Sequence, residues 1–306
     1  MRKLAVVALV GFFAQLIDGS LGMAYGVTSS TLLIATGSQA AVSGAVVHLS
    51  ELGTSLASGA SHWKFGNVDW RAVGILAIPG GAGAYLGATG LTALDPEVAT
   101  PVVSVVLLLL GVYVLWRFLA IGERRPEFNG RLSAKFLAPL GLVAGAVDGF
   151  GGGGWGPVGT PALLSSGKLE PRKVVGSIDT SEFVVALGAS IGFLLHLGRE
   201  QISFTFVLAL LVGGVVAAPI AAYVVRHLPA RVLGVGAGGL IILTNLKTIL
   251  ESGFGIAGWP VALIALVWAV IWVNLVVWVW RADRRVNAKL QAGEVVETAA
   301  IGAQHI

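Results

Sequence analysis

The chain contains no cysteine, and charged residues occupy only 12% of its 306 positions. Without cysteine it can form neither disulfide bonds nor a cysteine-ligated metal site. Soluble domains carry charge at about 25% of their positions, so the low charged fraction argues against an ordinary soluble protein. The net charge of +4 does not indicate a nucleic-acid partner, because the basic residues lie between apolar runs rather than on one helical face.

Motifs for ATP use and for zinc-dependent hydrolysis are missing as well. The glycine run at 151–154 is not followed by the Gly-Lys-Ser/Thr ending of a phosphate-binding loop, and no His-Glu-x-x-His helix occurs. We therefore predict that the protein is not an enzyme and that it has neither a cofactor nor a bound metal ion.

Apolar residues and glycine are abundant: 56% of the residues are hydrophobic, and 43 are glycine. Apolar runs of about 20 residues, enough to cross a bilayer, recur along the whole length. They predict an all-α polytopic membrane protein. Because Met1-Arg2-Lys3 leads straight into an apolar run that ends in Asp18 and glycine, we predict a first membrane segment rather than a signal peptide.

The chain is also internally repeated. At an offset of 130 residues Asp18 aligns with Asp148, and at an offset of 131 Glu51 aligns with Glu182. Since acids and glycines match rather than common leucines and valines, we interpret the repeat as a gene duplication. Further matching pairs are Gly11/Gly141, Gly22/Gly152, Gly26/Gly156 and Ser50/Ser181.

Each repeat is predicted to contain two short apolar segments followed by three long ones. At 1.5 Å per residue the short segments cannot cross about 30 Å of hydrocarbon, so each pair forms an interrupted span or a re-entrant hairpin. The expected ranges are 4–17, 27–36, 39–61, 71–93 and 97–118 in the first repeat, and 136–147, 157–166, 174–196, 203–225 and 231–250 in the second.

The basic residues favour hairpins. With hairpins and an outside N-terminus, most of the 20 lysines and arginines fall on the inner side, whereas continuous crossings divide them almost evenly. A hairpin plus three crossings gives the halves opposite orientations, so we predict two inverted repeats, each a broken re-entrant hairpin plus three transmembrane helices. The predicted parts are repeat 1 (1–120), a cytoplasmic linker (121–135), repeat 2 (136–250), an extra C-terminal helix (257–280) whose tryptophans are typical of an interfacial belt, and a cytoplasmic tail (281–306).

Two stretches of acid and glycine, at 18–26 and 148–157, interrupt the membrane segments. Irregular backbone at membrane depth survives only when it is buried in protein or lines a polar cavity, and paired breaks mark transporter binding sites. Each stretch leads into a short helix, and the N-terminus of a helix attracts anions. The alternative is that the glycines only allow close helix packing. The predicted substrate-binding residues are Gly22, Gly26, Thr28, Ser29, Gly152, Gly153, Gly154, Trp155, Gly156 and Thr160.

Several ionisable residues are predicted to lie within the hydrocarbon layer, where such groups mark transport routes or proton relays. His48 precedes Glu51 by three residues, so both lie on one helical face. The alternatives are that the aspartates accept backbone hydrogen bonds that hold the broken loops, and that His48 is a packed residue. His62 is expected in the loop after this helix. The predicted coupling and gating residues are Asp18, His48, Glu51, Asp148, Asp179 and Glu182.

At these residues the chain resembles the sulfite exporter TauE/SafE family of bacterial permeases, over about residues 5–250. The resemblance implies a prokaryotic inner-membrane protein that moves sulfur-containing anions such as sulfite or organosulfonates. The motifs that carry it are Asp18-Gly-Ser-Leu-Gly-Met-Ala-Tyr-Gly26, His48-Leu-Ser-Glu51, Ser61-His62 with Gly66-Asn67-Val68-Asp69, the stretch 148–157 with Gly159-Thr160-Pro161, and Gly176-Ser177-Ile178-Asp179-Thr180-Ser181-Glu182-Phe183.

We therefore expect a multi-pass secondary transporter of the inner (plasma) membrane, with a cytoplasmic C-terminus. Its expected partners are a small anionic substrate, protons and the lipid bilayer. No nucleic-acid partner is expected, and the sequence leaves open whether the protein forms a homo-oligomer. Proton-coupled alternating access is the favoured mechanism. The alternatives are a passive anion channel, a transporter of another small organic anion, and a membrane-embedded enzyme or assembly protein.

Overall fold

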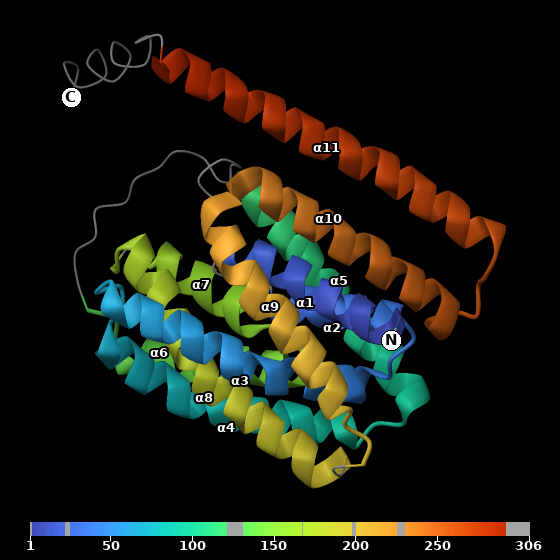
Figure 1. The fold of residues 1–306 in the computed structure, drawn as a ribbon, viewed down its shortest axis with the longest axis horizontal. Helices are drawn as coiled ribbons and strands as arrows, with labels where there is room; N and C mark the ends of the chain where they lie inside the picture. Colours follow the sequence, from blue (N-terminus) through green and yellow to red (C-terminus); the bar gives the residue numbers. More distant parts are fainter. Residues whose placement is uncertain are drawn as a thin grey trace.

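The computed structural model describes residues 2–21, 25–120, 131–166, 168–197, 200–224 and 230–291. In these ranges all regular structure is helical, and most helices lie side by side with similar axis directions (Figure 1). The elements are α1 (Arg2–Leu21), α2 (Tyr25–Ala35), α3 (Ala40–Lys64), α4 (Trp70–Thr92), α5 (Pro96–Ala120), α6 (Ala134–Gly151), α7 (Trp155–Ser165), α8 (Pro171–Leu197), α9 (Phe204–Val224), α10 (Ala230–Thr248), η1 (Ile249–Gly253) and α11 (Trp259–Gln291).

Local residue chemistry explains several of these boundaries. Asp69 precedes α4 with an extended backbone, and its side chain accepts a hydrogen bond from the N–H of Ala72, as an N-cap does. Proline begins α5 at Pro96, where its missing N–H costs nothing. Helix α6 ends at Gly152, whose φ of 70° is left-handed and therefore suits glycine.

Five helical segments are long and apolar enough to cross a membrane, judged by length and composition within the described ranges. They are Trp70–Thr92, Pro96–Ala120, Ala134–Gly151, Lys173–Leu197 and Trp259–Arg285. The prediction of an all-α polytopic membrane protein is confirmed.

The expected length of the first segment in each repeat was wrong. Helix α6 continues past position 147 through Asp148 to Gly151, and its 18 residues are enough to cross a membrane. Helix α1 similarly reaches Leu21 and has 20 residues, about 30 Å. Gly149, near the end of α6, stays helical because the backbone of Ala84 packs on it. Helices α2 and α7, with 11 residues each, span only about 16 Å.

The two halves pack mainly against each other. Helix α4 packs on α6, and α1 packs on α9. These two pairs are equivalent, because α6 is the counterpart of α1 in the second repeat and α9 is the counterpart of α4. Helix α3 packs on its own counterpart α8, and α5 packs on α10. Both of these pairs run antiparallel: Gly44 meets Phe193 whereas Gly59 meets Thr180, and the α5–α10 contacts follow the same reversed order.

Glycine makes the closest of these contacts possible. A Cβ atom added at Gly145 would overlap the carbonyl of Gly80, and one added at Gly149 would overlap the carbonyl of Ala84. Gly83 meets Leu142 in the same way from the α4 side. For the glycines between α4 and α6, including Gly149 beside Asp148, the close-packing alternative therefore holds.

Helix α11 continues to Gln291, beyond its expected end at 280, because no glycine or proline interrupts residues 281–291. In Figure 1 it lies along α10 at the edge of the molecule. The indole N–H of Trp268 donates to the carbonyl of Gly239 (2.9 Å), and that of Trp272 to the carbonyl of Val235 (3.1 Å). Two of the tryptophans assigned to an interfacial belt therefore attach α11 to α10.

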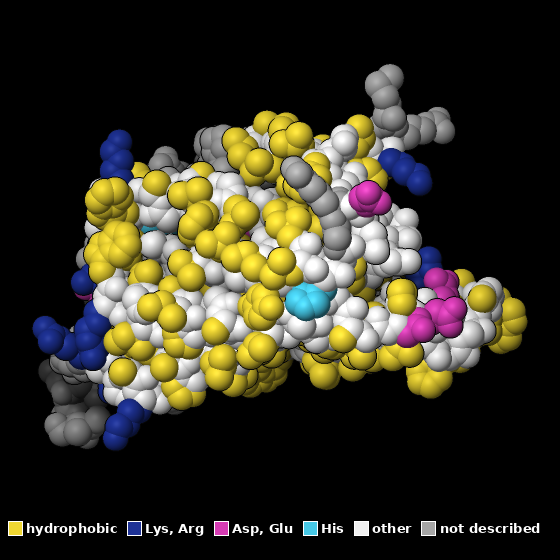
Figure 2. Space-filling model, turned by 90° about the horizontal axis from the view of Figure 1, so that it is seen from below, with side chains coloured by type: hydrophobic (Ala, Val, Ile, Leu, Met, Phe, Trp, Pro, Cys, Tyr) yellow, Lys and Arg dark blue, Asp and Glu magenta, His cyan; other side chains and the backbone are white. Residues whose placement is uncertain are grey.

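Charge is unevenly distributed along the helix axes. Figure 2 shows lysines and arginines concentrated toward the left, most of the visible acids toward the right, and an apolar band between. We call the left end the basic end; it includes the C-terminus of α3 and the N-termini of α4 and α8. Lys64, in the last turn of α3, and Arg71, in the first turn of α4, lie at this end.

Candidate functional site

The α1–α2 and α6–α7 junctions meet inside the protein. The hydroxyl of Ser30 donates to the carbonyl of Gly152 at 2.7 Å. A Cβ atom added at Gly153 would overlap the backbone N of Val27, and one at Gly26 would lie 2.7 Å from the carbonyl O of Gly152. The two glycine stretches, which we call the tips, therefore touch backbone to backbone.

The structure places the predicted binding residues at these tips, except Gly22, which lies outside the described residues. Trp155 is buried, and its indole N–H donates to the carbonyl of Ile178 (3.1 Å). Gly154 and Gly156 are buried too. The hydroxyls of Thr28, Ser29 and Thr160 are buried without a hydrogen-bond partner among the described residues.

The contact between the tips is closed in this conformation. Where Gly153 meets Val27 there is not even room for a methyl group, so an anion cannot lie at that point. Unpartnered buried hydroxyls nevertheless cost free energy. The arrangement thus combines a closed backbone contact with buried hydroxyls that have no hydrogen-bond partner among the described residues.

Asp18 and Asp148 organise the tips through backbone hydrogen bonds. The Oδ1 atom of Asp18 accepts from the N–H of Tyr25 at 3.1 Å. The Oδ1 atom of Asp148 accepts from the N–H groups of Gly154 (2.7 Å) and Trp155 (3.0 Å). These contacts fit the alternative that the aspartates hold the broken loops. The Oδ2 atom of Asp148 accepts no hydrogen bond among the described residues and lies 3.8 Å from Nδ1 of His48.

His48 lies between two hydrogen-bond acceptors. Its Nδ1 is 2.8 Å from Oε2 of Glu51, and its Nε2 is 3.2 Å from the carbonyl O of Asp148. A carbonyl oxygen only accepts, so Nε2 carries a hydrogen atom. The short Nδ1···Oε2 contact then needs a further proton, bound to His48 or to Glu51. With both side chains at most 2% exposed, this pair is a buried, proton-loaded unit joined to the second tip.

A second cluster contains Asp179 and a residue that sequence analysis missed. His62 lies in the last turn of α3 rather than in the following loop, and its Nε2 is 3.2 Å from Oδ2 of Asp179. Ser58 donates to the same oxygen at 2.8 Å. The available signal was position: His62 follows Glu51 by 11 residues, about three turns, and therefore shares its helical face.

The two clusters are electrostatic neighbours. Glu182 interacts with Glu51 and with Asp18, and Asp18 interacts with Asp179. The structure thus brings together all six predicted coupling residues, with His62 added, around the tips and the α3–α8 contact.

His48, Glu51 and Asp148 are close enough together to be considered as metal ligands. One imidazole nitrogen and one oxygen of each carboxylate lie within 4.8 Å of one another. A metal ion needs an imidazole nitrogen with a free lone pair. Both nitrogens of His48 instead face oxygen acceptors. The observed hydrogen bonds therefore suit a proton better than a metal ion.

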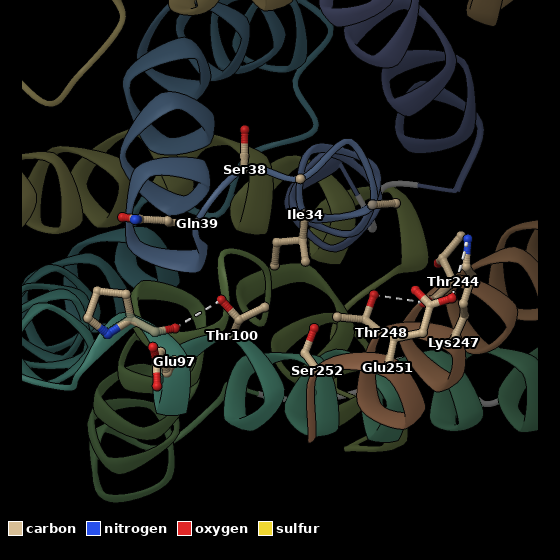
Figure 3. Close-up of a pocket in the computed structure, with 13 residues that line it drawn as sticks. Ile34, Ser38, Gln39, Glu97, Thr100, Thr244, Lys247, Thr248, Glu251 and Ser252 are labelled. Carbon is tan, nitrogen blue, oxygen red and sulfur yellow. Dashed lines mark hydrogen bonds and ion pairs between the residues drawn. The ribbon is translucent and has the colours of Figure 1, made fainter. Parts of the chain in front are cut away.

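A cavity of about 620 Å³ opens beside α2, α5 and α10 at the end opposite the basic end. Figure 3 shows Lys247 and Thr248 of α10 on one side and Thr100 of α5 on the other, with Ile34 of α2 between them. Lys247 lies 3.9 Å from Glu251. Deeper in the protein, the amide of Asn245 donates to the hydroxyl of Thr31 (2.9 Å) and joins α10 to α2.

A second cavity of about 620 Å³ lies between α5 and α7, lined by Tyr113, Arg117 and Pro157 among others. Neither cavity has a predicted binding residue in its lining. Sequence analysis missed both, since each is formed by helices far apart in the chain.

Comparison with known proteins places these features in context. The family profile described as sulfite exporter TauE/SafE matches residues 7–248, ending before α11. The "Probable membrane transporter protein YtnM" of Bacillus subtilis (strain 168) is 52% identical over 255 residues, covering 82% of this chain and 84% of that protein. A "Probable membrane transporter protein" of Xylella fastidiosa (strain 9a5c) is 26% identical over 216 residues, covering 68% and 77%. No solved structure matches the chain.

Proposed function

Because the chain belongs to the sulfite exporter TauE/SafE family and is a membrane transporter rather than an enzyme, we propose that it carries small sulfur-containing anions, such as sulfite or organosulfonates, by proton-coupled alternating access. The observation that carries the proposal is the contact of the proton-loaded His48–Glu51 pair with the backbone of Asp148 at the second tip. A proton site and the closed tips are thereby one connected unit.

The packing of the halves supports an inverted-repeat carrier. Counterpart helices α3 and α8 run antiparallel, as do α5 and α10. Such pairs arise when a two-fold axis in the membrane plane relates the halves. The tips then enter from opposite faces, and rocking of one half against the other exposes their contact to each side in turn.

The substrate binds where the tips separate. There the N-terminal turns of α2 and α7 offer backbone N–H groups beyond those of Tyr25 and Trp155, which Asp18 and Asp148 bind. Thr28, Ser29 and Thr160 offer hydroxyls without a partner among the described residues. Helix N-termini carry partial positive charge and favour anions. Neutral donors and dipoles therefore hold the anion and release it without having to break an ion pair.

Proton binding favours the closed tips. With the proton in place, His48 donates to the carbonyl of Asp148 and also satisfies Glu51. Without it, an imidazole lone pair faces a carboxylate, and a buried charge lacks compensation. That arrangement costs several kcal/mol at membrane depth. Loss of the proton thus favours separation of the tips.

The concentration of lysine and arginine at one end supports a cytoplasmic location for that end. Helix α11 ends beside it, since Arg231 at the start of α10 pairs with Asp283 at 3.6 Å. We therefore propose an inner-membrane protein with a cytoplasmic C-terminus and with the cavity of Figure 3 on the outer side.

Flux in proteoliposomes tests the proposal. We expect a pH gradient to drive uptake of sulfite or a small sulfonate, and substrate inside the vesicles to accelerate exchange, as a carrier requires. Exchange that internal substrate does not accelerate would indicate a channel. Transport of small carboxylates in place of every sulfur anion tested would contradict the proposed substrate class.

A further inference from the structure

A polar stripe follows one face of α3. Glu51, Ser55, Ser58 and His62 succeed one another at spacings of four, three and four residues, which keeps them on one side of a helix. Ser55 donates to the carbonyl of Glu51, and Ser58 donates to Asp179. The stripe extends from the buried His48–Glu51 pair to the basic end, where His62 reaches the surface with its side chain 24% exposed.

Helix α8 supplies acids along the same line. Asp179 and Glu182 are one turn apart on α8, and Asp179 is bonded to His62. Glu182 in turn interacts with Glu51 across the α3–α8 contact. Each titratable group from His62 to His48 therefore neighbours the next one, in the order His62, Asp179, Glu182, Glu51 and His48.

The other end of this line is different. At the repeat offset of 131, the counterpart of His62 is Phe193, and the counterpart of Asp179 is His48. Both pairs join equivalent positions of the two repeats. His62 lies against Asp179, and Phe193 stacks on His48 with ring centroids 5.9 Å apart and ring planes at 19°. Phe193 is fully buried and packs into the space left by Gly44.

We propose that, in this conformation, protons reach and leave the His48–Glu51 pair from the basic end alone, through His62, Asp179 and Glu182, while Phe193 closes the opposite end. This inference rests on the proposed proton coupling. It assigns His62 as the residue that exchanges protons with water and Phe193 as the barrier that prevents a leak.

Each step is a balanced proton transfer. His62 gives the proton on Nε2 to Oδ2 of Asp179 and takes another at Nδ1, a buried nitrogen without a hydrogen-bond partner among the described residues, from water that enters beside the exposed part of the side chain. The proton then passes from Asp179 to Glu182 and on to Glu51, each carboxylate accepting a proton as the preceding acid loses one. No oxidant or further reactant is needed.

The groups that face each histidine are few. His62 faces Asp179 of α8, and Asp179 interacts with Asp18 of α1. His48 faces Glu51 on its own helix and Asp148 of α6. The pH response of the path therefore depends on these carboxylates, and no lysine or arginine takes part in the described contacts of either histidine.

Exchanging the two counterpart residues tests the path. His62→Phe gives the basic end the aromatic residue of the opposite end, and His62→Gln keeps a donor for Asp179 but cannot relay a proton. For both variants we expect pH-gradient-driven flux to fall at least about tenfold, while substrate counterflow, which needs no net proton movement, continues. Preserved counterflow also shows that the variants fold.

Phe193→His should have the opposite effect. Titratable groups would then extend to both ends, so we expect substrate-independent proton leak, read with a pH-sensitive dye inside the vesicles. His196→Phe is the matched control, because His196 is exposed and its described contacts, with the carbonyl of Gly192 and the ring of Tyr85, lie outside the proposed path.

The outcomes separate this inference from the proposed function. If the wild-type protein moves no protons with its substrate, the coupling proposal fails and the path fails with it. If the wild-type protein is coupled but both His62 variants keep full pH-driven flux, or Phe193→His remains proton-tight, the path alone is overturned.

Discussion

Asp18 and Asp148 stand 130 positions apart, and each binds the backbone N–H of the aromatic residue seven positions later. The Oδ1 atom of Asp18 accepts from Tyr25 at 3.1 Å, and that of Asp148 accepts from Trp155 at 3.0 Å. Each acid therefore closes its own tip and supports the first turn of the following short helix. The relationship makes the structural role of these acids separable from any role in coupling.

Replacing Asp148 tests that separation. Asp148→Ala removes the acceptor of two buried N–H groups, so we expect a loss of about 1–2 kcal/mol of stability, the usual effect of losing a helix N-cap. Asp148→Asn keeps an acceptor oxygen and should lose much less. Thermal unfolding in detergent measures both. Equal destabilisation by the two changes would show that the charge, rather than the cap, matters.

Gly153→Ala tests whether closure of the tips belongs to the transport cycle. A Cβ atom there would overlap the backbone N of Val27, so we expect the closed state to be lost and substrate counterflow to fall by at least about tenfold, the equivalent of 1.4 kcal/mol. Gly74→Ala on α4 is the control, because a Cβ atom at Gly74 meets nothing within 4 Å. Normal counterflow in Gly153→Ala would mean that the tips need not close.

The helices and the tips could be predicted from sequence because hydropathy, glycine and acids are local features. The bounds of α3 and α8 differ from the predicted segments by at most three residues at either end, and the family resemblance is confirmed. The lengths of α1 and α6 were underestimated, since glycine was interpreted as a helix end although close packing on α4 keeps Gly149 helical.

Contacts between distant segments were beyond sequence reasoning. The approach of His62 to Asp179 depends on the register between α3 and α8, and the attachment of Trp272 to Val235 depends on how α11 lies against α10. Neither register follows from the composition of one helix. The polar stripe from Glu51 to His62 was readable, but ending the predicted helix at 61 removed His62 from it.

Lys247 is expected to attract the substrate into the cavity beside α2, α5 and α10. Lys247 lines this cavity and carries a positive charge, whereas Glu97 and Glu251 in the same lining carry negative charges (Figure 3). For Lys247→Gln we expect a several-fold higher KM with little change in kcat, because an exposed charge acts on encounter rather than on the tips. The effect should disappear at high salt, where such charges are screened. A change in kcat alone would contradict this role.

Trp272→Ala should loosen α11 from α10. The indole of Trp272 fills the space over Gly239 and also binds the carbonyl of Val235. Since Trp272 is only part-buried, we expect a loss of about 1–3 kcal/mol of stability from the lost packing and hydrogen bond. Trp259→Ala is the control, because Trp259 is 77% exposed. Equal stability of the two variants would show that α11 does not support α10.

Glu182→Gln tests proton coupling directly. The amide is nearly isosteric with a protonated carboxyl but can neither take up nor release a proton, so net proton transfer through position 182 should stop. We expect pH-gradient-driven flux to be abolished, whereas counterflow, in which the carrier cycles without net proton release, persists. Glu182 is half-buried and interacts with Glu51. Gel filtration and thermal unfolding check that the variant folds. Unchanged pH-driven flux would remove Glu182 from the mechanism and would leave His48 and Glu51 to act without it.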